Sequence, residues 1–367
     1  MKINTITCVG AQNESMAIIS SDDLPEIVDE SAIVYESMRS GIIDTTNADD
    51  LKKLSKNIIH YPMMSKIVEM IRDCIELSKE SNEPQCMGIK GGPGSGKTTI
   101  LLDFAAGFPR KYTDSGSVIP LLYIKTPSPV TEKALASKIL EVLGDPASTS
   151  GTLPALTSRA TNLIRDCGVG VVILDDFHHL IDQKTDEVLY KVADWIKVLI
   201  KETQIPYIVV SVDNHIDRIL ENNEQLSRLF LYVEDITPLE FDVNNEGTVI
   251  DFNNFVRLAE KKIGKEILKN DSWKEMLLRI WYATDGVVGN LMNLLRLAAV
   301  YAERAGNPFI TLDDLSLAFE KRLKRHLKKE INPFLVPEGR HFDMPPIVPK
   351  KPKNKRLNKK TSLSAGK

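Results

Sequence analysis

The sequence contains few cysteines: Cys8, Cys74, Cys86 and Cys167 are the only four among 367 residues. No two of them have the close spacing typical of a metal-binding pair, and Cys86 falls within an apolar run that predicts a strand. This scarcity argues against a zinc site and against a disulfide framework. It favours reduced thiols inside a cell.

Long apolar runs and a secretory leader are absent as well. No uninterrupted apolar run approaches the roughly 18 residues that indicate a membrane helix, and the first twenty residues lack a basic segment followed by an apolar one. Hydrophobic residues make up 43% of the chain and charged residues 26%. This balance is typical of a globular protein with a sizeable core, and the length suggests about two domains.

The small net charge of −3 conceals a strong asymmetry. Residues 1–50 contain ten acidic and two basic residues, whereas residues 321–367 contain fifteen basic and three acidic ones. A basic end invites a polyanionic partner such as nucleic acid. For the last basic stretch, residues 350–360, a solvated tail with no specific partner is an equal alternative.

Short apolar strands alternate with helical patterns in the middle of the chain. The predicted strands are 86–90, 118–125, 169–174, 206–212 and 229–236, and helices are predicted at 62–81, 98–107, 131–143, 153–166, 186–202 and 215–221. Near-continuous apolar strands joined by helices indicate an α/β fold with a parallel five-stranded sheet buried on both faces.

After Pro238 the pattern becomes entirely helical, over 252–263, 272–284, 288–305 and 312–329. Thr311, followed by Asp313 and Asp314, predicts the N-cap and acidic first turn of the last of these helices. We therefore divide the chain into an acidic N-terminal arm (1–54), an α/β domain (55–238), an all-helical domain (239–330) and a basic extended tail (331–367).

The strongest chemical signal is GGPGSGKT, residues 91–98, which follows a predicted strand and opens a predicted helix. It matches the pattern G-x-x-x-x-G-K-[ST] of phosphate-binding loops in the structural context that this motif requires. Glycines let backbone N–H groups curl around a phosphate, Lys97 reaches the β- and γ-phosphates, and the Thr98 hydroxyl is a ligand for Mg²⁺. The predicted nucleotide-binding residues of the loop are Gly91, Gly92, Pro93, Gly94, Ser95, Gly96, Lys97, Thr98 and Thr99.

The second half of the predicted site ends the strand VGVVILDD. Asp175 lies at the point where a carboxylate reaches the magnesium ion beside the phosphate-binding loop. Asp176 occupies the position at which many such ATPases carry a glutamate, and we predict that it polarises the attacking water. Its alternative role is a helix N-cap or a surface charge. The predicted cofactors are thus ATP and Mg²⁺.

Two later positions are candidates for contact with the γ-phosphate. The strand 206–212 is followed by Asp213 and Asn214, and either residue could sense the phosphate; an ordinary turn would have the same sequence. Arg228 precedes the last strand and is a candidate arginine finger for a neighbouring subunit's ATP site. An isolated surface arginine is the alternative.

The order of these parts resembles that of AAA+ ATPases, with a phosphate-binding loop, paired aspartates, a polar strand end, an arginine and a helical lid. A closer resemblance, to the TniB/TnsC family of transposition ATPases, covers about residues 55–335. It is carried by YIKTPSPVTEKALASKIL, GTLPALTSRATNLIRDCGVGVVILDD, NEQLSRLF, ATDGVVGNLMNLLRLAAVYA and EINPF. It implies an AAA+ P-loop NTPase in which helices sandwich the parallel five-stranded sheet, with an all-α lid domain.

The resemblance also implies a function. Members of this family assemble ATP-dependent rings or helical filaments on duplex DNA and connect a target-selection protein to the transposase. We therefore expect an ATPase of the bacterial cytoplasm that uses hydrolysis as an assembly switch, and the atypical residues Asp176 and Asn290 predict that this hydrolysis is slow. Its expected partners are duplex DNA, further copies of itself, a transposase and a TniQ-like target-selection protein.

Three residues take roles only through the resemblance. Lys133 and Thr152 match positions that contact the DNA backbone, and an ammonium and a hydroxyl both suit phosphate contact; a solvated helix charge is the alternative for Lys133. Asn290 occupies a lid position where relatives often carry an ATP-contacting arginine. Arg296 is a distant substitute for that arginine.

Two other classes of function stay open on the sequence. One is a replication-type AAA+ loader or helicase, and the other is a signalling NTPase that binds only protein partners. The transposase itself is excluded, because the paired carboxylates belong to the nucleotide site and no acidic triad accompanies an RNase H-like strand pattern.

Overall fold

The computed structural model describes residues 58–114, 116–128, 131–177, 186–212, 215–221, 223–269, 272–336 and 341–342. The whole of the predicted arm, residues 1–54, lies outside these residues, as do Asp213 and Asn214. None of the helices in the described part of the chain has the length and apolar character needed to cross a bilayer.

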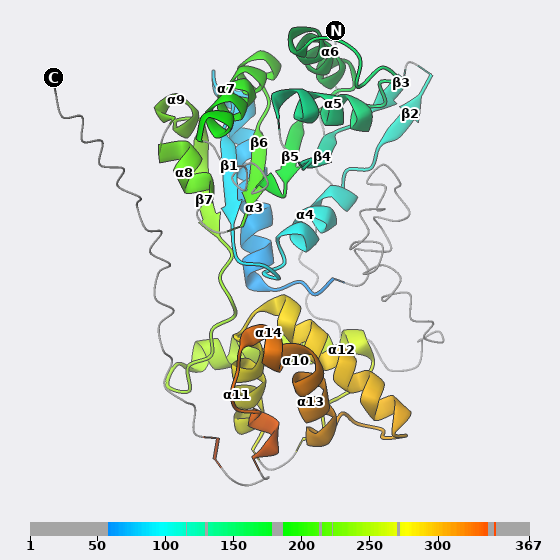
Figure 1. The fold of residues 1–367 in the computed structure, drawn as a ribbon, viewed down its shortest axis with the longest axis vertical. Coiled ribbons are helices and arrows are strands. Elements are labelled where there is room, and N and C mark those ends of the chain that lie inside the picture. The colour runs from blue at the N-terminus through cyan, green and yellow to red at the C-terminus, as the bar shows by residue number, and fades with distance from the viewer. Residues whose placement is uncertain are drawn as a thin grey trace, which may run out of the picture. The chain divides into compact units, whose positions relative to one another are not determined.

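Five parallel strands form the central sheet of the α/β domain, in the order β4-β5-β6-β1-β7 (Figure 1). Their bounds are Cys86–Lys90 for β1, Leu121–Lys125 for β4, Val171–Asp175 for β5, Tyr207–Ser211 for β6 and Phe230–Asp235 for β7. The register pairs Lys125 with Asp175 and Lys90 with Ser211. The carboxyl ends of these strands therefore meet at one edge, and the prediction of a parallel five-stranded sheet is confirmed.

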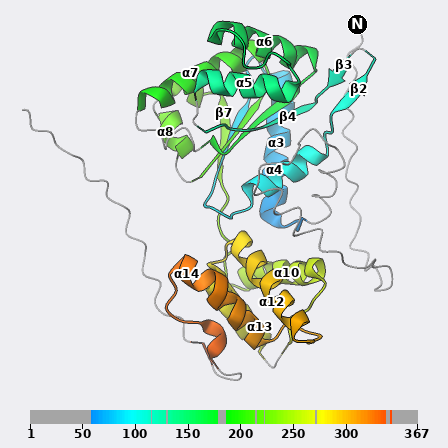
Figure 2. The same ribbon diagram turned by 45° about the vertical axis from the view of Figure 1, so that its right-hand side comes forward.

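Helices cover both faces of this sheet (Figures 1 and 2). On one face α3 (Pro62–Glu80) packs against α4 (Lys97–Ala106), β1 and β7. The other face is covered by α5 (Glu132–Leu143), α6 (Leu153–Asp166), α7 (Asp186–Thr203), α8 (His215–Glu221) and α9 (Glu224–Ser227). One continuous apolar core joins α5, α6 and the described part of α7 to the even-numbered side chains of β4 and β5, such as Leu122 and Val172. Near-continuous apolar strands are buried on both sides for this reason.

A β-hairpin of β2 (Lys111–Thr113) and β3 (Gly116–Val118) was not predicted. Its strands are only three residues long and mostly exposed. They consequently lack the alternation of apolar and polar residues on which strand prediction depends.

The lid consists of α10 (Glu246–Ile263), α11 (Trp273–Thr284), α12 (Val288–Arg304) and α13 (Leu312–Ala318). The predicted cap of the last helix is confirmed. The Thr311 hydroxyl accepts from the Asp314 backbone N–H, and the Asp314 carboxylate accepts from the Thr311 backbone N–H. The predicted continuous helix 312–329 is interrupted by a π-helical turn, Phe319–Leu323, before α14 (Lys324–Leu327).

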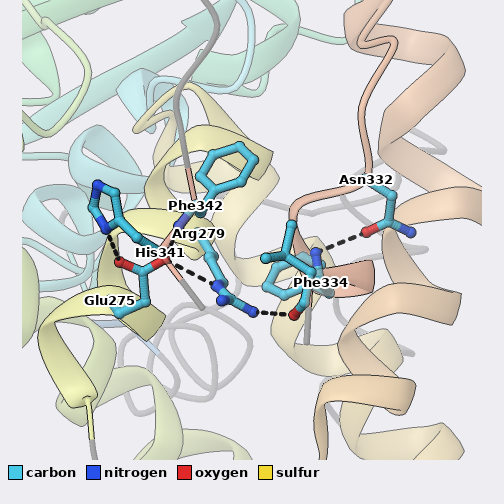
Figure 3. A network of polar contacts seen from close by, with 7 residues as sticks. Glu275, Arg279, Asn332, Phe334, His341 and Phe342 are labelled. Carbon is cyan, nitrogen blue, oxygen red and sulfur yellow. Dashed lines mark hydrogen bonds and ion pairs between the residues drawn. The ribbon is translucent and has the colours of Figure 1, made fainter. Parts of the chain in front are cut away.

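Chain beyond α14 packs back onto the lid (Figure 3). A short 3₁₀ helix, Pro333–Leu335, buries Phe334 against Phe319. Arg279, only 3% exposed, donates to the Val336 carbonyl oxygen at 2.7 Å, and its partner Glu275 accepts from the Phe342 backbone N–H at 2.6 Å. The packed surface of the lid thus includes residues from the segment predicted as tail.

The connection between the two domains is held at Gly286. The Leu239 backbone N–H donates to the Gly286 carbonyl oxygen, and the Trp281 indole N–H donates to the Leu239 carbonyl oxygen, at 2.8 and 2.9 Å. Gly286 has φ +67°, and a Cβ there would lie 2.1 Å from the Leu239 oxygen. Only glycine fits this position.

We predict that Gly286→Ala destabilises the protein by several kcal/mol, at the upper end of single substitutions, because backbone strain and an overlap with a backbone oxygen combine. Gly306→Ala is the matched control. Gly306 has φ +72° but no atom within 4 Å of the added methyl group, so only the strain of about 1–2 kcal/mol remains. Urea unfolding of both variants measures the difference, and equal losses would refute the account of this connection.

Candidate nucleotide-binding site

The phosphate-binding loop joins β1 to α4 through residues 91–96. Gly94 and Gly96 have φ values of +79° and +95°, which other residues rarely adopt. Gly91 is confined by packing, since a Cβ there would lie 2.9 Å from the Ile236 carbonyl oxygen. The loop leads directly into the amino terminus of α4, where the first N–H groups and the helix dipole favour an anion.

Lys97 is the first residue of α4, and its ammonium is turned into the loop. Its Nζ donates to the carbonyl oxygens of Gly91 and Gly92, at 2.6 and 3.0 Å. The residue is only 8% exposed. The positive charge is thereby held within the loop, as its predicted role requires.

Asp175 at the end of β5 is joined directly to the start of α4. Its Oδ2 accepts from the Thr98 hydroxyl at 2.7 Å and from the Tyr123 hydroxyl at 2.7 Å, and its Oδ1 accepts from the Asp176 backbone N–H at 2.8 Å. Burial raises the pKa of the Asp175 carboxyl, while the hydrogen bonds from Tyr123 and Thr98 oppose that rise. Burial also raises the pKa of Tyr123 well above its ordinary value, so this phenol remains a donor.

Asp176 follows with φ +57°, a left-handed conformation that is uncommon for aspartate. Its carboxylate faces Lys125 at the end of β4, with 3.4 Å between Oδ2 and Nζ. Residues with strained backbone conformations of this kind cluster at functional sites. The predicted base therefore lies beside the predicted metal-holding carboxylate and is paired with a lysine that sequence reasoning did not link to it.

Sequence reasoning also missed two hydroxyl groups near the loop. Counted over the described residues, the buried Tyr61 and Ser211 hydroxyls have no hydrogen-bond partner. Ser211 ends β6, between the strands that carry Asp175 and the loop. The Tyr61 oxygen lies 3.7 Å from where a Cβ on Gly96 would lie. A serine at the end of an apolar strand could have predicted a polar group at this edge of the sheet, whereas nothing in the sequence indicated a role for Tyr61.

The lid contacts the loop at the start of α12. The Gly289 backbone N–H of α12 donates to the Gly94 carbonyl oxygen at 2.9 Å, and a Cβ on Gly289 would lie 2.9 Å from that oxygen. Asn290 follows, but its side-chain amide donates to the Thr284 carbonyl oxygen at 3.2 Å. The loop and the lid are therefore in contact, while the Asn290 side chain is hydrogen-bonded within the lid, to the last residue of α11.

Arg228 is not part of this cluster. It follows α9, is paired with Glu224 at 2.8 Å, and both side chains are more than 70% exposed. An exposed i,i+4 pair contributes only about 0.3–0.5 kcal/mol. The guanidinium is consequently open to exchange its partner for a stronger anion.

The two predicted DNA contacts lie at the same end of the helix layer. The Arg110 guanidinium donates to the Val142 and Leu143 carbonyl oxygens at the end of α5, and the Cys167 carbonyl oxygen after α6 accepts from the Ile119 N–H just before β4. Because Lys111 pairs with Val118, Arg110 lies near Ile119 as well.

Helices α5 and α6 therefore both end at the amino edge of the sheet and run in the same direction. Lys133 in the first turn of α5 and Thr152 just before α6 lie at the other ends of these helices, and both are exposed. Lys125 ends β4 at the carboxyl edge of the sheet.

The residues present fit a magnesium nucleotide. Thr98 and Asp175 offer a hydroxyl and a carboxylate, the oxygen ligands that Mg²⁺ prefers. The loop offers glycine backbone and a buried ammonium, which suit phosphate oxygens. The unpartnered Ser211 hydroxyl adds a polar group at the same edge of the sheet.

Comparisons with known proteins agree with this geometry. A family model described as "Bacterial TniB protein" matches residues 52–234. The ORC1-type DNA replication protein 1 of Sulfolobus acidocaldarius is 25% identical over 260 residues, which make up 69% of this chain and 60% of that protein. The chain thus spans about 60% of the length of this curated relative.

Solved structures show the same fold at low identity. The ORC1 protein of Aeropyrum pernix, solved in complex with DNA, matches with a TM-score of 0.51 and 15% identity over 72% of this chain and 66% of that one. The Cdc6p protein of Pyrobaculum aerophilum matches with a TM-score of 0.53 and 15% identity, over 72% of this chain and 69% of that one. The fold is that of an AAA+ ATPase.

We predict that Lys97→Met weakens ATP binding by about 100-fold, the loss expected when about 3 kcal/mol of charge-assisted hydrogen bonding to phosphate is removed. Lys90→Met is the matched control, because Lys90 immediately precedes the loop but pairs with Asp217 at 2.8 Å. Titration with a fluorescent ATP analogue measures both affinities. A similar loss in the two variants would mean that Lys97 contributes only general charge.

Proposed function

Because the chain belongs to the TniB family through residues 52–234, we propose that it is an ATP-dependent regulator of DNA transposition. It binds and hydrolyses ATP slowly, oligomerises on duplex DNA, and links a TniQ-like target-selection protein to a transposase. One observation supports the ATPase step above all: Thr98 and Asp175 are joined at 2.7 Å inside the region that the family model matches.

The loop and its lysine bind the triphosphate. Backbone N–H groups at the start of α4 and the Lys97 ammonium hold the β- and γ-phosphate oxygens. Thr98 and Asp175 hold Mg²⁺, which when bound supplies positive charge next to these oxygens. The contact between Gly289 and Gly94 couples the lid to the same loop.

Asp176 acts as the base that orients and deprotonates the attacking water. Lys125 lies 3.4 Å from its carboxylate, so this pairing competes with the water for the same oxygen. A shorter side chain than glutamate and a competing lysine both slow hydrolysis. Asp213, Asn214 or the buried Ser211 hydroxyl completes the γ-phosphate contacts.

A neighbouring subunit supplies Arg228 to this site, since the residue is highly exposed and held only by a weak surface pair. Asn290 reads the nucleotide through the lid less strongly than an arginine, because an amide carries no charge. Hydrolysis is therefore a property of the assembly and times its disassembly.

Duplex DNA binds across the amino-terminal ends of α5 and α6, through the exposed Lys133 and Thr152. Their contacts go to phosphates, so binding is independent of base sequence. Lys125, at the end of β4 beside Asp176, extends this basic surface toward the nucleotide site. This arrangement supports DNA-dependent control of assembly in the bacterial cytoplasm.

A replication-type AAA+ loader is the second candidate. The similarity to the ORC1-type replication protein of Sulfolobus acidocaldarius favours it. Such a protein forms closed rings that load or unwind, whereas the transposition regulator persists on DNA as a filament.

We predict filaments or ring stacks in electron micrographs of the protein with duplex DNA and a non-hydrolysable ATP analogue. Asp176→Asn should assemble equally well with ATP but disassemble at least tenfold more slowly, because the base that removes a proton from water is lost. Lys97→Met should not assemble. Isolated monomers of the wild-type protein would contradict the proposal, and discrete closed rings with unwinding activity would favour the second candidate.

A further inference from the structure

Among the described residues, Tyr123 is the one side chain outside the phosphate-binding loop, α4 and the aspartate pair that hydrogen-bonds to the Asp175 carboxylate. Its hydroxyl donates to Oδ2 at 2.7 Å, the same oxygen that accepts from Thr98. The residue is 7% exposed. The buried Tyr123 hydroxyl therefore holds the same Asp175 oxygen, Oδ2, that contacts the proposed metal ligand Thr98.

Strand register explains how Tyr123 reaches this carboxylate. Tyr123 pairs with Ile173, and Asp175 is two residues further along the same face of β5. Diagonal neighbours on adjacent strands are about 7–8 Å apart, within reach of an aromatic side chain. Both residues face α4, which carries Thr98, because the opposite face holds Leu122, Ile124, Val172 and Leu174 in the other core.

The hydrogen bonds at Asp175 leave its carboxylate little freedom. Thr98 and Tyr123 hold Oδ2 from two sides, and the Asp176 N–H holds Oδ1. Groups that hydrogen-bond to a metal-binding side chain orient it, and removing one typically weakens metal binding. Without Tyr123, the Thr98 hydroxyl would be the remaining described donor to Oδ2, and the Asp176 N–H the remaining one to Oδ1.

We propose that Tyr123 is a positioning residue for magnesium binding: its hydroxyl orients the Asp175 carboxylate toward the metal that Thr98 and Asp175 hold. This inference rests on the proposed nucleotide site. Tyr123 touches neither nucleotide nor metal, and acts only through Asp175.

The test uses Mn²⁺ as a spectroscopic probe of the magnesium position, in the full-length protein with ADP at one fixed pH. Tyr123→Phe removes the hydroxyl and keeps the ring. Tyr207→Phe is the matched control, since it removes another buried hydroxyl. Tyr207 is the first residue of β6, and its hydroxyl lies 3.4 Å from the Thr203 hydroxyl. Electron paramagnetic resonance measures free and bound Mn²⁺, and ADP affinity is measured separately in EDTA.

We expect Tyr123→Phe to weaken Mn²⁺ affinity about tenfold, within the 10–100-fold range for such supporting groups, and to alter the Mn²⁺ line shape. ADP affinity in EDTA should stay unchanged, and Tyr207→Phe should match the wild type in both measurements. Unchanged Mn²⁺ affinity in Tyr123→Phe would overturn the inference. So would a parallel loss of metal-free ADP binding, which indicates a purely structural role. Wild-type protein that binds no ADP would overturn the nucleotide site itself, and the inference with it.

Discussion

The contact between Thr98 and Asp175 is the interaction on which the rest of the structure depends. It ties the first turn of α4 to the carboxyl end of β5, although β6 separates β5 from the strand that leads into the loop. A buried carboxylate is tolerated only where donors satisfy it, and Asp175 has three within 2.8 Å. The sheet order, the glycine loop and the register of β4 against β5 all serve to bring these donors together.

The sequence was sufficient for the parts whose signal is local. The motif at residues 91–98 and the apolar strand before Asp175 predicted the loop between β1 and α4 and the nearness of Thr98 and Asp175, whose roles toward nucleotide and metal stay predictions. The five strands were predicted within a few residues. Thr311 and Asp314 also predicted the start of their helix, because a capping box involves residues only three positions apart.

What the sequence did not reveal depends on contacts between distant segments. Tyr123 was read only as part of an apolar strand, since its role arises from the register with Ile173. The pairing of Lys125 with Asp176 has the same origin. Phe342 lies in a segment that composition marked as extended, yet its backbone bonds to Glu275 on α11. Asp213 and Asn214 fall outside the described residues, and their role stays a prediction.

These features suit the ATP site that we propose, which binds the nucleotide fully and hydrolyses it slowly. Asp176 is shared with Lys125, Asn290 is bonded within the lid, and Arg228 projects from the surface. We propose that two subunits complete one hydrolytic site. The most direct test mixes Asp176→Asn protein, which assembles and keeps Arg228 but lacks the base, with Arg228→Ala protein on duplex DNA. We predict that each variant alone loses about 100-fold or more of the ATPase rate, and that the mixture regains a substantial part of it. Wild-type rates from Arg228→Ala alone, or a mixture as inactive as its components, would contradict the account.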